Sequence, residues 1–325
     1  MSGGLLQLSG IVVDLVHRVD HLPAAGEEVE TPSPLITAGG GFNAMVTAKR
    51  LGAVVTYGGT LGTGNFADRI EQQLAAESIC VAGGRRIAID QGTCTVIVDR
   101  SGERSFISYH GAERRVDAAH LESLSASSYD WALLTGYSLF KAESAAAFVP
   151  WLAALGTPPK LFFDPGPTVA NIPKPALKVA MRRAQWLSAN TKEAEIMTGD
   201  TSPAAAAQQL AHGREGALVR AGADGCWLAT GRAVTHVPGF RVRCVDSNGA
   251  GDTHDGAFLA GLIAGHDPVD AAVLANAAAA LSTTRIGPAT SPDLEETHRL
   301  LDRNGITLKK PATGSEMAWM GITGR

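Results

Sequence analysis

Short apolar runs alternate with amphipathic helical segments along most of the chain. Near the N-terminus, Leu5–Leu15 is apolar and β-branched, which predicts a buried strand that ends at Asp14. Further strand residues are expected at 16–19. A helix is expected over residues 43–51 and a second one over residues 66–77.

After residue 128 the alternation of strands and helices becomes regular. Strands are predicted at residues 131–134, 161–164, 186–188 and 217–220, with helices starting near Ala142, Pro175 and Pro203. Such alternation implies parallel βαβ units, so the sequence predicts a doubly wound α/β core. Two Ala-rich helices, Asp252–Ile263 and Pro268–Thr284, follow and are expected to pack closely.

Two stretches differ from this pattern, residues 14–36 and residues 87–110. Around the polar turn at residues 100–103, apolar and polar positions alternate with a period of two, which is typical of a β-hairpin with one polar face. The two stretches are therefore predicted to form a small β-sheet beside the core, which would act as a lid. Residues 1–310 are expected to form one domain. Residues 311–325, which contain Pro, Gly and Ser and show no period, are expected to be a loosely held tail.

Composition narrows the classes of function. The chain has 325 residues, of which 45% are hydrophobic and 18% charged, so a disordered chain is excluded. A net charge of −4 gives no general attraction to nucleic acid or anionic lipid. No apolar run approaches the ~18 residues of a membrane span, and the N-terminus lacks the basic start of a secretory signal. The four cysteines show no metal spacing, which favours reduced thiols and a cytoplasmic location.

The most informative segment for chemistry is Gly249-Ala250-Gly251-Asp252, immediately before a predicted helix. Small residues at a helix N-terminus expose backbone N–H groups that can bind an anion. A carboxylate beside that anion site could take a proton from a hydroxyl that attacks a phosphorus atom. Spacing alone equally allows a glycine turn with Asp252 as a helix N-cap.

A second glycine motif, Gly62-x-Gly64-x-x-Ala67, follows a strand and opens a helix, as in dinucleotide-binding proteins. Such sites need an acidic residue about 20 positions further on, at the end of the next strand. Asp90 is too distant for this role, so a Rossmann oxidoreductase is rejected. His254 is expected on the helix surface or at the rim of the site.

The segment from Asp246 to Phe258 resembles the C-terminal signature of the PfkB/ribokinase family of carbohydrate kinases. The N-terminal signature is also present as Ala38-Gly39-Gly40-Gly41-Phe42-Asn43, although Met45 and Gly64 depart from it. The resemblance covers roughly residues 8–300. The pieces Gly102-Glu103-Arg104-Ser105-Phe106 and Phe163-Asp164-Pro165-Gly166-Pro167 are similar to a bacterial branch of sugar kinases.

The resemblance implies a role for each matching residue. Asp252 would be the general base, assisted by the cradle Gly249, Ala250 and Gly251, while the sugar would be bound by Asp14, Gly39, Gly40 and Asn43. Nucleotide binding would fall to Asn190, Arg220, Gly222, Gly225 and Asn276, with Glu193 holding Mg²⁺ through water. A K⁺ site would use Asp246, Asn248, Ser282, Arg285, Gly287 and Ser291. For Arg220, where the family usually has Thr, either a phosphate contact or an ion pair with Asp224 is open.

The function implied is transfer of a phosphoryl group from ATP to a hydroxyl of a sugar or sugar-like molecule, with Mg²⁺ and K⁺ as the metals. A nucleoside kinase of the same family is the first alternative, and a sugar-binding protein without activity is the second. Because small sheets leave edges and faces to cover, a homodimer through the lid is also expected.

Overall fold

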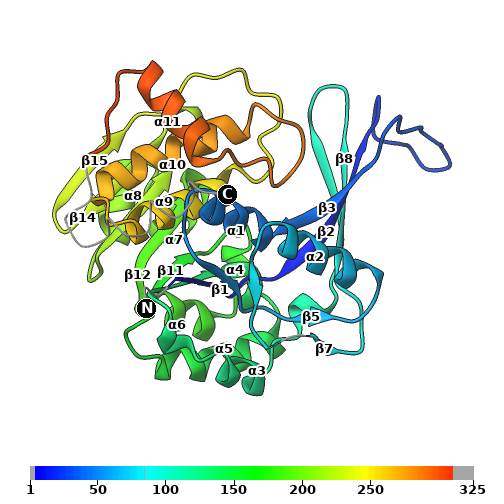
Figure 1. Ribbon diagram of the computed structural model, residues 1–325, viewed down its shortest axis with the longest axis horizontal. Coiled ribbons are helices and arrows are strands. Elements are labelled where there is room, and N and C mark those ends of the chain that lie inside the picture. Colours follow the sequence, from blue (N-terminus) through cyan, green and yellow to red (C-terminus); the bar gives the residue numbers. More distant parts are fainter. Residues whose placement is uncertain (1–3, 84, 310–325) are drawn as a thin grey trace, which may run out of the picture.

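The computed structural model describes residues 4–83 and 85–309 of the chain. Its centre is a nine-stranded sheet (Figure 1). From edge to edge its strands are β15 (Ala233–Val237), β14 (Cys226–Thr230), β13 (Gly216–Arg220), β12 (Ala184–Asn190), β11 (Lys160–Asp164), β10 (Trp131–Thr135), β1 (Leu5–Gln7), β4 (Val55–Tyr57) and β6 (Cys80–Val81). The strands from β6 to β13 are parallel, which confirms the predicted doubly wound core, while β14 and β15 are antiparallel.

Helices cover both faces of this sheet and bury one hydrophobic cluster on each (Figure 1). One cluster lies under α1 (Gly41–Arg50), α2 (Asn65–Ala76), α9 (Ala250–Ile263), α10 (Pro268–Ser282) and α11 (Leu294–Arg303). The other lies under α3 (Ala118–Ser123), α4 (Gly136–Leu139), α5 (Ala142–Ala154), α6 (Lys174–Arg183), α7 (Thr191–Thr198) and α8 (Pro203–Leu210). The apolar strand residues that alternate between the two clusters account for the near-continuous hydrophobic runs in the sequence.

Helices α9 and α10 pack closely, as their small residues predict. A Cβ atom at Gly261 would lie 2.9 Å from the Cβ of Ala271, so a larger residue would separate the helices. On another side of α9, a Cβ at Gly256 would lie 2.2 Å from the carbonyl oxygen of Ala44 in α1. Helix α9 is therefore fixed between α1 and α10.

A separate four-stranded sheet projects from the core (Figure 1), in the order β3 (Leu35–Gly40), β2 (Ile11–Arg18), β8 (Thr93–Val98) and β9 (Arg104–Tyr109). We call it the lid sheet. Strands β8 and β9 form the predicted antiparallel hairpin, and β2 joins it by parallel pairing with β8. The predicted small sheet is thus confirmed.

The boundaries of the N-terminal strands were predicted wrongly. The apolar stretch Leu5–Leu15 is two strands, because β1 pairs with β10 and β4 of the core whereas β2 belongs to the lid sheet. The chain passes from one sheet to the other at Gly10, where a Cβ would lie 2.7 Å from Glu113 Cβ. Asp14 consequently lies in the middle of β2 rather than at a strand end.

The elements absent from the sequence prediction include β14, β15 and α11. Strand β15 is a mostly exposed edge strand, so its apolar pattern is weak. Helix α11, in contrast, carries a readable signal: Asp293 and Glu296 form a reciprocal capping box at its start. The small pair β5 (Leu61–Gly62) and β7 (Arg85–Ile87) completes the strands of the described residues. The predicted tail at residues 311–325 lies outside the described residues.

Candidate active site

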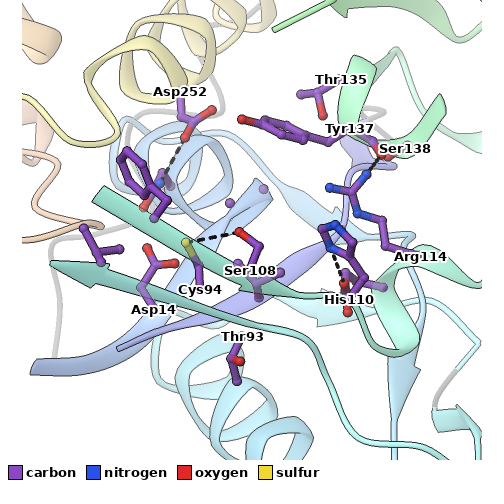
Figure 2. Close-up of a pocket in the computed structure, with 18 of the residues that line it drawn as sticks. Asp14, Thr93, Cys94, Ser108, His110, Arg114, Thr135, Tyr137, Ser138 and Asp252 are labelled. Atoms are coloured by element: carbon purple, nitrogen blue, oxygen red, sulfur yellow. Dashed lines mark hydrogen bonds and ion pairs between the residues drawn. The ribbon is translucent and has the colours of Figure 1, made fainter. Parts of the chain in front are cut away.

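A cavity of about 540 Å³ lies between the lid sheet and the carboxyl edge of the core sheet (Figure 2). Ligand sites in open parallel sheets occur at this edge, because the loops after the strands meet there. Four polar residues predicted from the sequence line it: Asp14 from β2, Asn43 from α1, Asp252 from α9 and Asn248 from the loop before α9. The structure therefore brings together residues that are up to about 240 positions apart.

Asp14 faces the cavity because it shares one face of the lid sheet with its cross-strand neighbours Cys94 and Ser108. Its carboxylate lies against the backbone of β3, where a Cβ at Gly39 would be 2.1 Å from Asp14 Oδ2. Only glycine fits there. Burial, and secondarily the charge of Asp252, raises the pKa of Asp14 to about 7.

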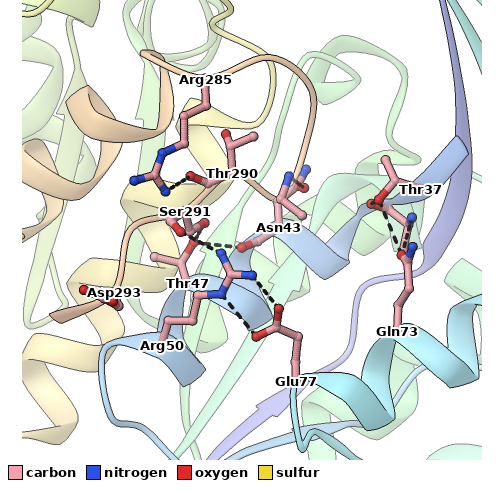
Figure 3. Close-up of polar contacts among 12 residues, drawn as sticks. Thr37, Asn43, Thr47, Arg50, Gln73, Glu77, Arg285, Thr290, Ser291 and Asp293 are labelled. Carbon is pink, nitrogen blue, oxygen red and sulfur yellow. Dashed lines mark hydrogen bonds and ion pairs between the residues drawn. The ribbon is translucent and has the colours of Figure 1, made fainter. Parts of the chain in front are cut away.

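Asn43 connects the two halves of the site. Its Nδ2 donates to Asp252 Oδ2 at 3.0 Å, and its Oδ1 accepts from the backbone N–H of Ala289 at 2.8 Å. It is a buried residue inside α1, whose N-cap is Gly40 (φ +62°), so Asn43 does not serve as the N-cap of this helix. Figure 3 shows that the same helix is also hydrogen-bonded to Ser291: the hydroxyls of Thr47 and Ser291 are bonded to each other, and Arg50 Nη1 donates to Ser291 O.

The glycine cradle has the geometry expected of an anion site. Gly249 (φ +74°) is the N-cap of α9, and Ala250, Gly251 and Asp252 form its first turn. Asp252 is therefore not the N-cap, and that alternative is wrong. Ala250 N donates to Ser247 O, whereas the N–H groups of Gly251 and Asp252 have no partner among the described residues. These free donors and the positive end of the helix favour a bound anion.

The carboxyl of Asp252 is held in an unusual state. Burial, and to a smaller extent the charge of Asp164, raise the pKa of this carboxyl. The hydrogen bond from Asn43 and the charge of Arg220 lower it, and the net result is a pKa of about 6. A carboxylate with a pKa close to neutrality is a stronger base than an exposed aspartate, yet it is still ionised at pH 7.

Arg220, at the carboxyl end of β13, lies at the centre of a buried ionic cluster. Its Nη1 lies 2.8 Å from Asp255 Oδ1 and 3.1 Å from Asp164 Oδ2, and its Nη2 lies 3.6 Å from Glu193 Oε2. Burial would lower the pKa of Arg220, but the three carboxylates raise it above its ordinary value. Of the two alternatives for Arg220, the ion pair with Asp224 is not formed, and the phosphate contact stays a prediction. We call Arg220, Asp164, Glu193 and Asp255 the arginine cluster.

The arginine cluster lies directly behind the cradle, because a Cβ at Gly251 would be 3.7 Å from the guanidinium of Arg220. Its other residues come from different elements: Asp164 ends β11, Glu193 begins α7 and Asp255 is in α9. Burial raises the pKa of Asp255 well above its ordinary value, against the lowering by Arg220. The sequence predicted no role for Asp255. Asp164 was named only as part of the Phe163–Pro167 segment that is similar to a bacterial branch of sugar kinases.

Two of the residues assigned to nucleotide binding lie at the turn after β13. Gly225 (φ +91°) has backbone neighbours so close that a Cβ would be 2.2 Å from Val237 O, whereas Gly222 (φ +60°) has open space around it. Asn276 in α10 is buried, donates to the carbonyls of Val237 and Pro238 and contacts His254. In this structure Asn276 therefore fixes the end of β15.

The region assigned to Mg²⁺ is the start of α7. Asn190 and Glu193 form a capping box there, in which Glu193 Oε2 accepts from Asn190 N at 2.8 Å. Glu193 Oε1 has no hydrogen-bond donor among the described residues, so it can accept from a hydrated cation. Among the described residues, no group of three or more acidic, His or Cys side chains is arranged so that it could hold one metal ion. This donor set fits an ion that keeps its water and is held mainly by phosphates, as Mg²⁺ usually is.

The residues assigned to K⁺ do come together, but Asp246 is already paired. Its Oδ1 accepts from Arg104 Nη2 at 2.5 Å and from Asn248 N at 3.0 Å, and its Oδ2 accepts from Gly287 N at 3.0 Å. The other members are Ser282, Arg285 and Ser291, which lie at the end of α10 and in the loop after it. The Arg285 guanidinium pairs with Glu296. This arrangement does not fit a cation at the Asp246 carboxylate.

Two other sequence interpretations can be compared with the structure. His254 is buried (3% exposed) rather than at the surface or rim, and burial lowers its pKa to about 3. The rejected dinucleotide motif has its helix start occupied: the Asp90 carboxylate accepts from the N–H groups of Phe66 and Ala67. An acidic side chain at that position leaves no room for a pyrophosphate, which supports the rejection.

Several residues that line the cavity were missed. Arg114 and His110 lie across the cavity from Asp14, and the Tyr137 side chain extends toward Asp252 (Figure 2). Arg114 stacks on the Tyr137 ring at 5.3 Å and donates to its backbone carbonyl. Tyr137 lies in α4, two residues after the end of β10, so the end of a predicted parallel strand was the signal that could have identified it.

Comparison with known proteins now decides the family. The pfkB family of carbohydrate kinases matches residues 6–295. The chain belongs to this family. It is 30% identical to the uncharacterized sugar kinase YegV of Escherichia coli K12 over 300 residues, which cover 90% of this chain and 92% of YegV. This pfkB-family chain is a carbohydrate kinase.

Solved structures show the same fold. A crystal structure of ribokinase from Thermotoga maritima has a TM-score of 0.81 and 24% identity, covering 92% of this chain and 99% of the other. The nucleoside kinase of Burkholderia thailandensis, solved in complex with inosine, has a TM-score of 0.78 and 19% identity, covering 94% and 99%. At these identities the likeness establishes the ribokinase fold of the pfkB-family chain and nothing finer.

Proposed function

We propose that the protein transfers the γ-phosphoryl group of ATP to a hydroxyl group of a sugar, with Asp252 as the general base. One observation carries this proposal. Asp252 lines the cavity, its pKa is raised to about 6, and it stands in the helix turn that leaves backbone N–H groups free for an anion. A base and an anion site within one helical turn match the needs of phosphoryl transfer.

In the proposed reaction, Asp14 accepts hydrogen bonds from sugar hydroxyls and Asn43 orients Asp252. The reacting hydroxyl gives its proton to Asp252 as its oxygen attacks the γ-phosphorus. The bond between that phosphorus and the bridging oxygen of the β-phosphate breaks, and ADP leaves. The N–H groups of Gly251 and Asp252 then bind the charge that develops on the transferred group. Mg²⁺ would supply neutralisation of the nucleotide phosphates and would be held through water by Glu193. The protein is proposed to act in the cytoplasm, where ATP and Mg²⁺ are available.

The acceptor is proposed to be a free sugar, and a nucleoside is the alternative. A cavity of about 540 Å³ is in the ordinary range for small-molecule sites and has room for either. The test is ATP consumption with a panel of pentoses, hexoses, sugar acids and nucleosides. Turnover with a sugar supports the proposal. Turnover only with nucleosides selects the alternative, and binding without turnover would make the protein a sugar-binding protein.

The role of Asp14 gives a separable prediction. Asp14→Ala is expected to raise the KM for the acceptor about ten- to a hundredfold, since a hydrogen bond to a charged group contributes roughly 1.5–3 kcal/mol. The KM for ATP should change little. The matched control is Asp20→Ala, an exposed lid carboxylate paired with Arg100. An unchanged acceptor KM with a raised ATP KM would place Asp14 at the wrong end of the site.

The raised pKa of Asp252 predicts the pH dependence. Since the carboxylate must be ionised to act as a base, kcat should fall as the pH drops through about 6 and level off above pH 7. Initial rates from pH 5 to pH 8 at saturating substrates measure this midpoint, and circular dichroism checks that the fold persists. A profile that stays flat down to pH 5 would exclude a base with a pKa near 6.

A homodimer through the lid sheet is also proposed. Leu15, Thr95 and Ile107 are cross-strand neighbours on the face opposite Asp14, and Ile107 is 65% exposed. Light scattering after size exclusion should give twice the 33.7 kDa mass of the chain, and Ile107→Asp should halve it. Val54→Asp, at an equally exposed apolar residue outside the lid (59%), is the control. A 33.7 kDa species for the wild type would remove the dimer.

A further inference from the structure

The Asp246 carboxylate lies between the lid sheet and the loop that leads into the cradle. It is buried (4% side-chain exposure) and it receives three N–H donors, from Arg104, Asn248 and Gly287. A second guanidinium, that of Arg18, lies with its Nη2 3.6 Å from Oδ2. Both carboxylate oxygens therefore already face a positive charge and a backbone donor.

The two arginines come from the lid and not from the core. Arg104 begins β9 and Arg18 ends β2, so they occupy neighbouring parts of one sheet. Arg104 is mostly covered (23% side-chain exposure), and its Nη1 also reaches Ser247 Oγ at 3.2 Å. A guanidinium that bridges two consecutive residues of the Asp246 loop is more strongly fixed than an exposed surface pair.

The neighbouring carbonyls are partly used as well. Ser282 O accepts from Thr290 Oγ1, and Ser291 O accepts from Arg50 Nη1. K⁺ sites are built from converging oxygen atoms that replace the water shell of the ion. Here the only carboxylate of the set is neutralised by arginine, and another cation beside two guanidinium groups would be repelled.

We propose that Arg104, supported by Arg18, takes the place of a monovalent cation at Asp246, so that this kinase needs no K⁺. Arg104 is then a positioning residue that acts through Asp246. The proposal rests on the proposed function only for its kinetic readout, since cation binding can be measured without an acceptor.

Two short chains of hydrogen bonds lead from the arginine to the reacting carboxylate. Along the first, Asp246 accepts from Asn248 N, the residue before the N-cap Gly249. Along the second, Asp246 accepts from Gly287 N, two residues before Ala289, whose N–H holds Asn43, which in turn binds Asp252. Arg104 therefore fixes both the cradle and the base. The lid also touches this loop through Leu35, whose Cδ2 would lie 2.5 Å from a Cβ at Gly287.

The first test is thermal unfolding of the full chain in KCl, NaCl and choline chloride at equal ionic strength. A K⁺ site filled about a hundredfold above its dissociation constant would raise Tm by several degrees. The wild type is expected to melt at the same temperature in all three salts. A higher Tm in KCl alone would overturn the proposal.

The second test uses Arg104→Met, which removes the charge but keeps the length of the side chain. Its Asp246 carboxylate is left without its main partner, so KCl should now raise its Tm above the value in choline chloride. Arg100→Met is the matched control, because Arg100 is an exposed lid arginine (77%) paired with exposed Asp20. The Tm of the control should be the same in KCl and in choline chloride. If the Tm of Arg104→Met is also the same in both salts, the proposal is overturned.

Kinetics with the acceptor found in the panel complete the test. In choline chloride, Arg104→Met should lose roughly tenfold or more in kcat, and KCl should restore part of the loss. Arg104→Lys keeps a positive charge beside Asp246, so it should retain more activity than Arg104→Met. Its activity should be the same in KCl and in choline chloride. Wild-type activity that depends on K⁺ would refute the proposal even though the kinase function stands. If no acceptor in the panel is phosphorylated, the proposed kinase function is refuted. The Tm measurements then decide alone whether Arg104 takes the place of K⁺ at Asp246.

Discussion

Asp252→Asn is expected to lower kcat by about 10²–10⁴-fold, which is the usual contribution of a general base. The amide keeps the size of the side chain and can still contact Asn43, so Tm and ATP affinity should change little. Steady-state rates, a melting curve and a nucleotide titration on the same preparation measure the three effects. Of the changes considered, this one is expected to affect activity most.

The matched control for this variant is Asp224→Asn, at an exposed carboxylate on the turn after β13. It should leave kcat within about twofold of the wild type, because Asp224 has no ion-pair partner among the described residues. If Asp252→Asn keeps more than about a tenth of the wild-type kcat, the loss is below the range of a catalytic base and the assignment is wrong.

Arg220→Met is expected to lower the free energy of unfolding by about 3–5 kcal/mol. The reason is that Asp164, Glu193 and Asp255 would remain buried without their shared cation. For a chain of this size the loss corresponds to a fall in Tm of roughly 4–7 °C. Urea unfolding at pH 7 measures the effect, and Arg232→Met, at an exposed arginine in the turn after β14, is the control.

The same variant has a pH signature. Without Arg220, the raised pKa values of Glu193 and Asp255 should rise further, so the folded state binds protons more readily than the unfolded one. Such groups cost stability above their folded pKa values, and the cost disappears as the pH falls below them. The deficit of Arg220→Met should therefore shrink between pH 7 and pH 5. A deficit that grows on acidification would contradict the arginine cluster as described.

The sequence predicted the features that depend on local periodicity. The regular alternation after residue 128 was sufficient for the parallel core, and the two-residue period around residues 93–108 was sufficient for the hairpin. The cradle at Gly249–Asp252 could be recognised because an anion site at a helix N-terminus is built from consecutive residues. In these cases the neighbours in the sequence are also the neighbours in space.

Features that depend on distant contacts could not be predicted. The partners of Arg220 come from β11, α7 and α9, and nothing in the local sequence distinguishes them from the adjacent Asp224. The same holds for Asp246, whose partner Arg104 is more than a hundred residues away. The break between β1 and β2 was hidden because both strands are apolar, although they belong to different sheets.

The close packing of α1 against α9 also has a consequence for synthesis of the protein. Gly256 meets Ala44 across an interval of about 210 residues, and Asn43 meets Asp252 and Ala289 across similar intervals. At 5–20 residues per second a ribosome needs roughly 10–40 s to cover that distance. During that time the inner face of α1 has no permanent cover, which makes it a natural place for a chaperone to bind. The site can be completed only after Asp252 and Ala289, both in the last quarter of the chain, have emerged.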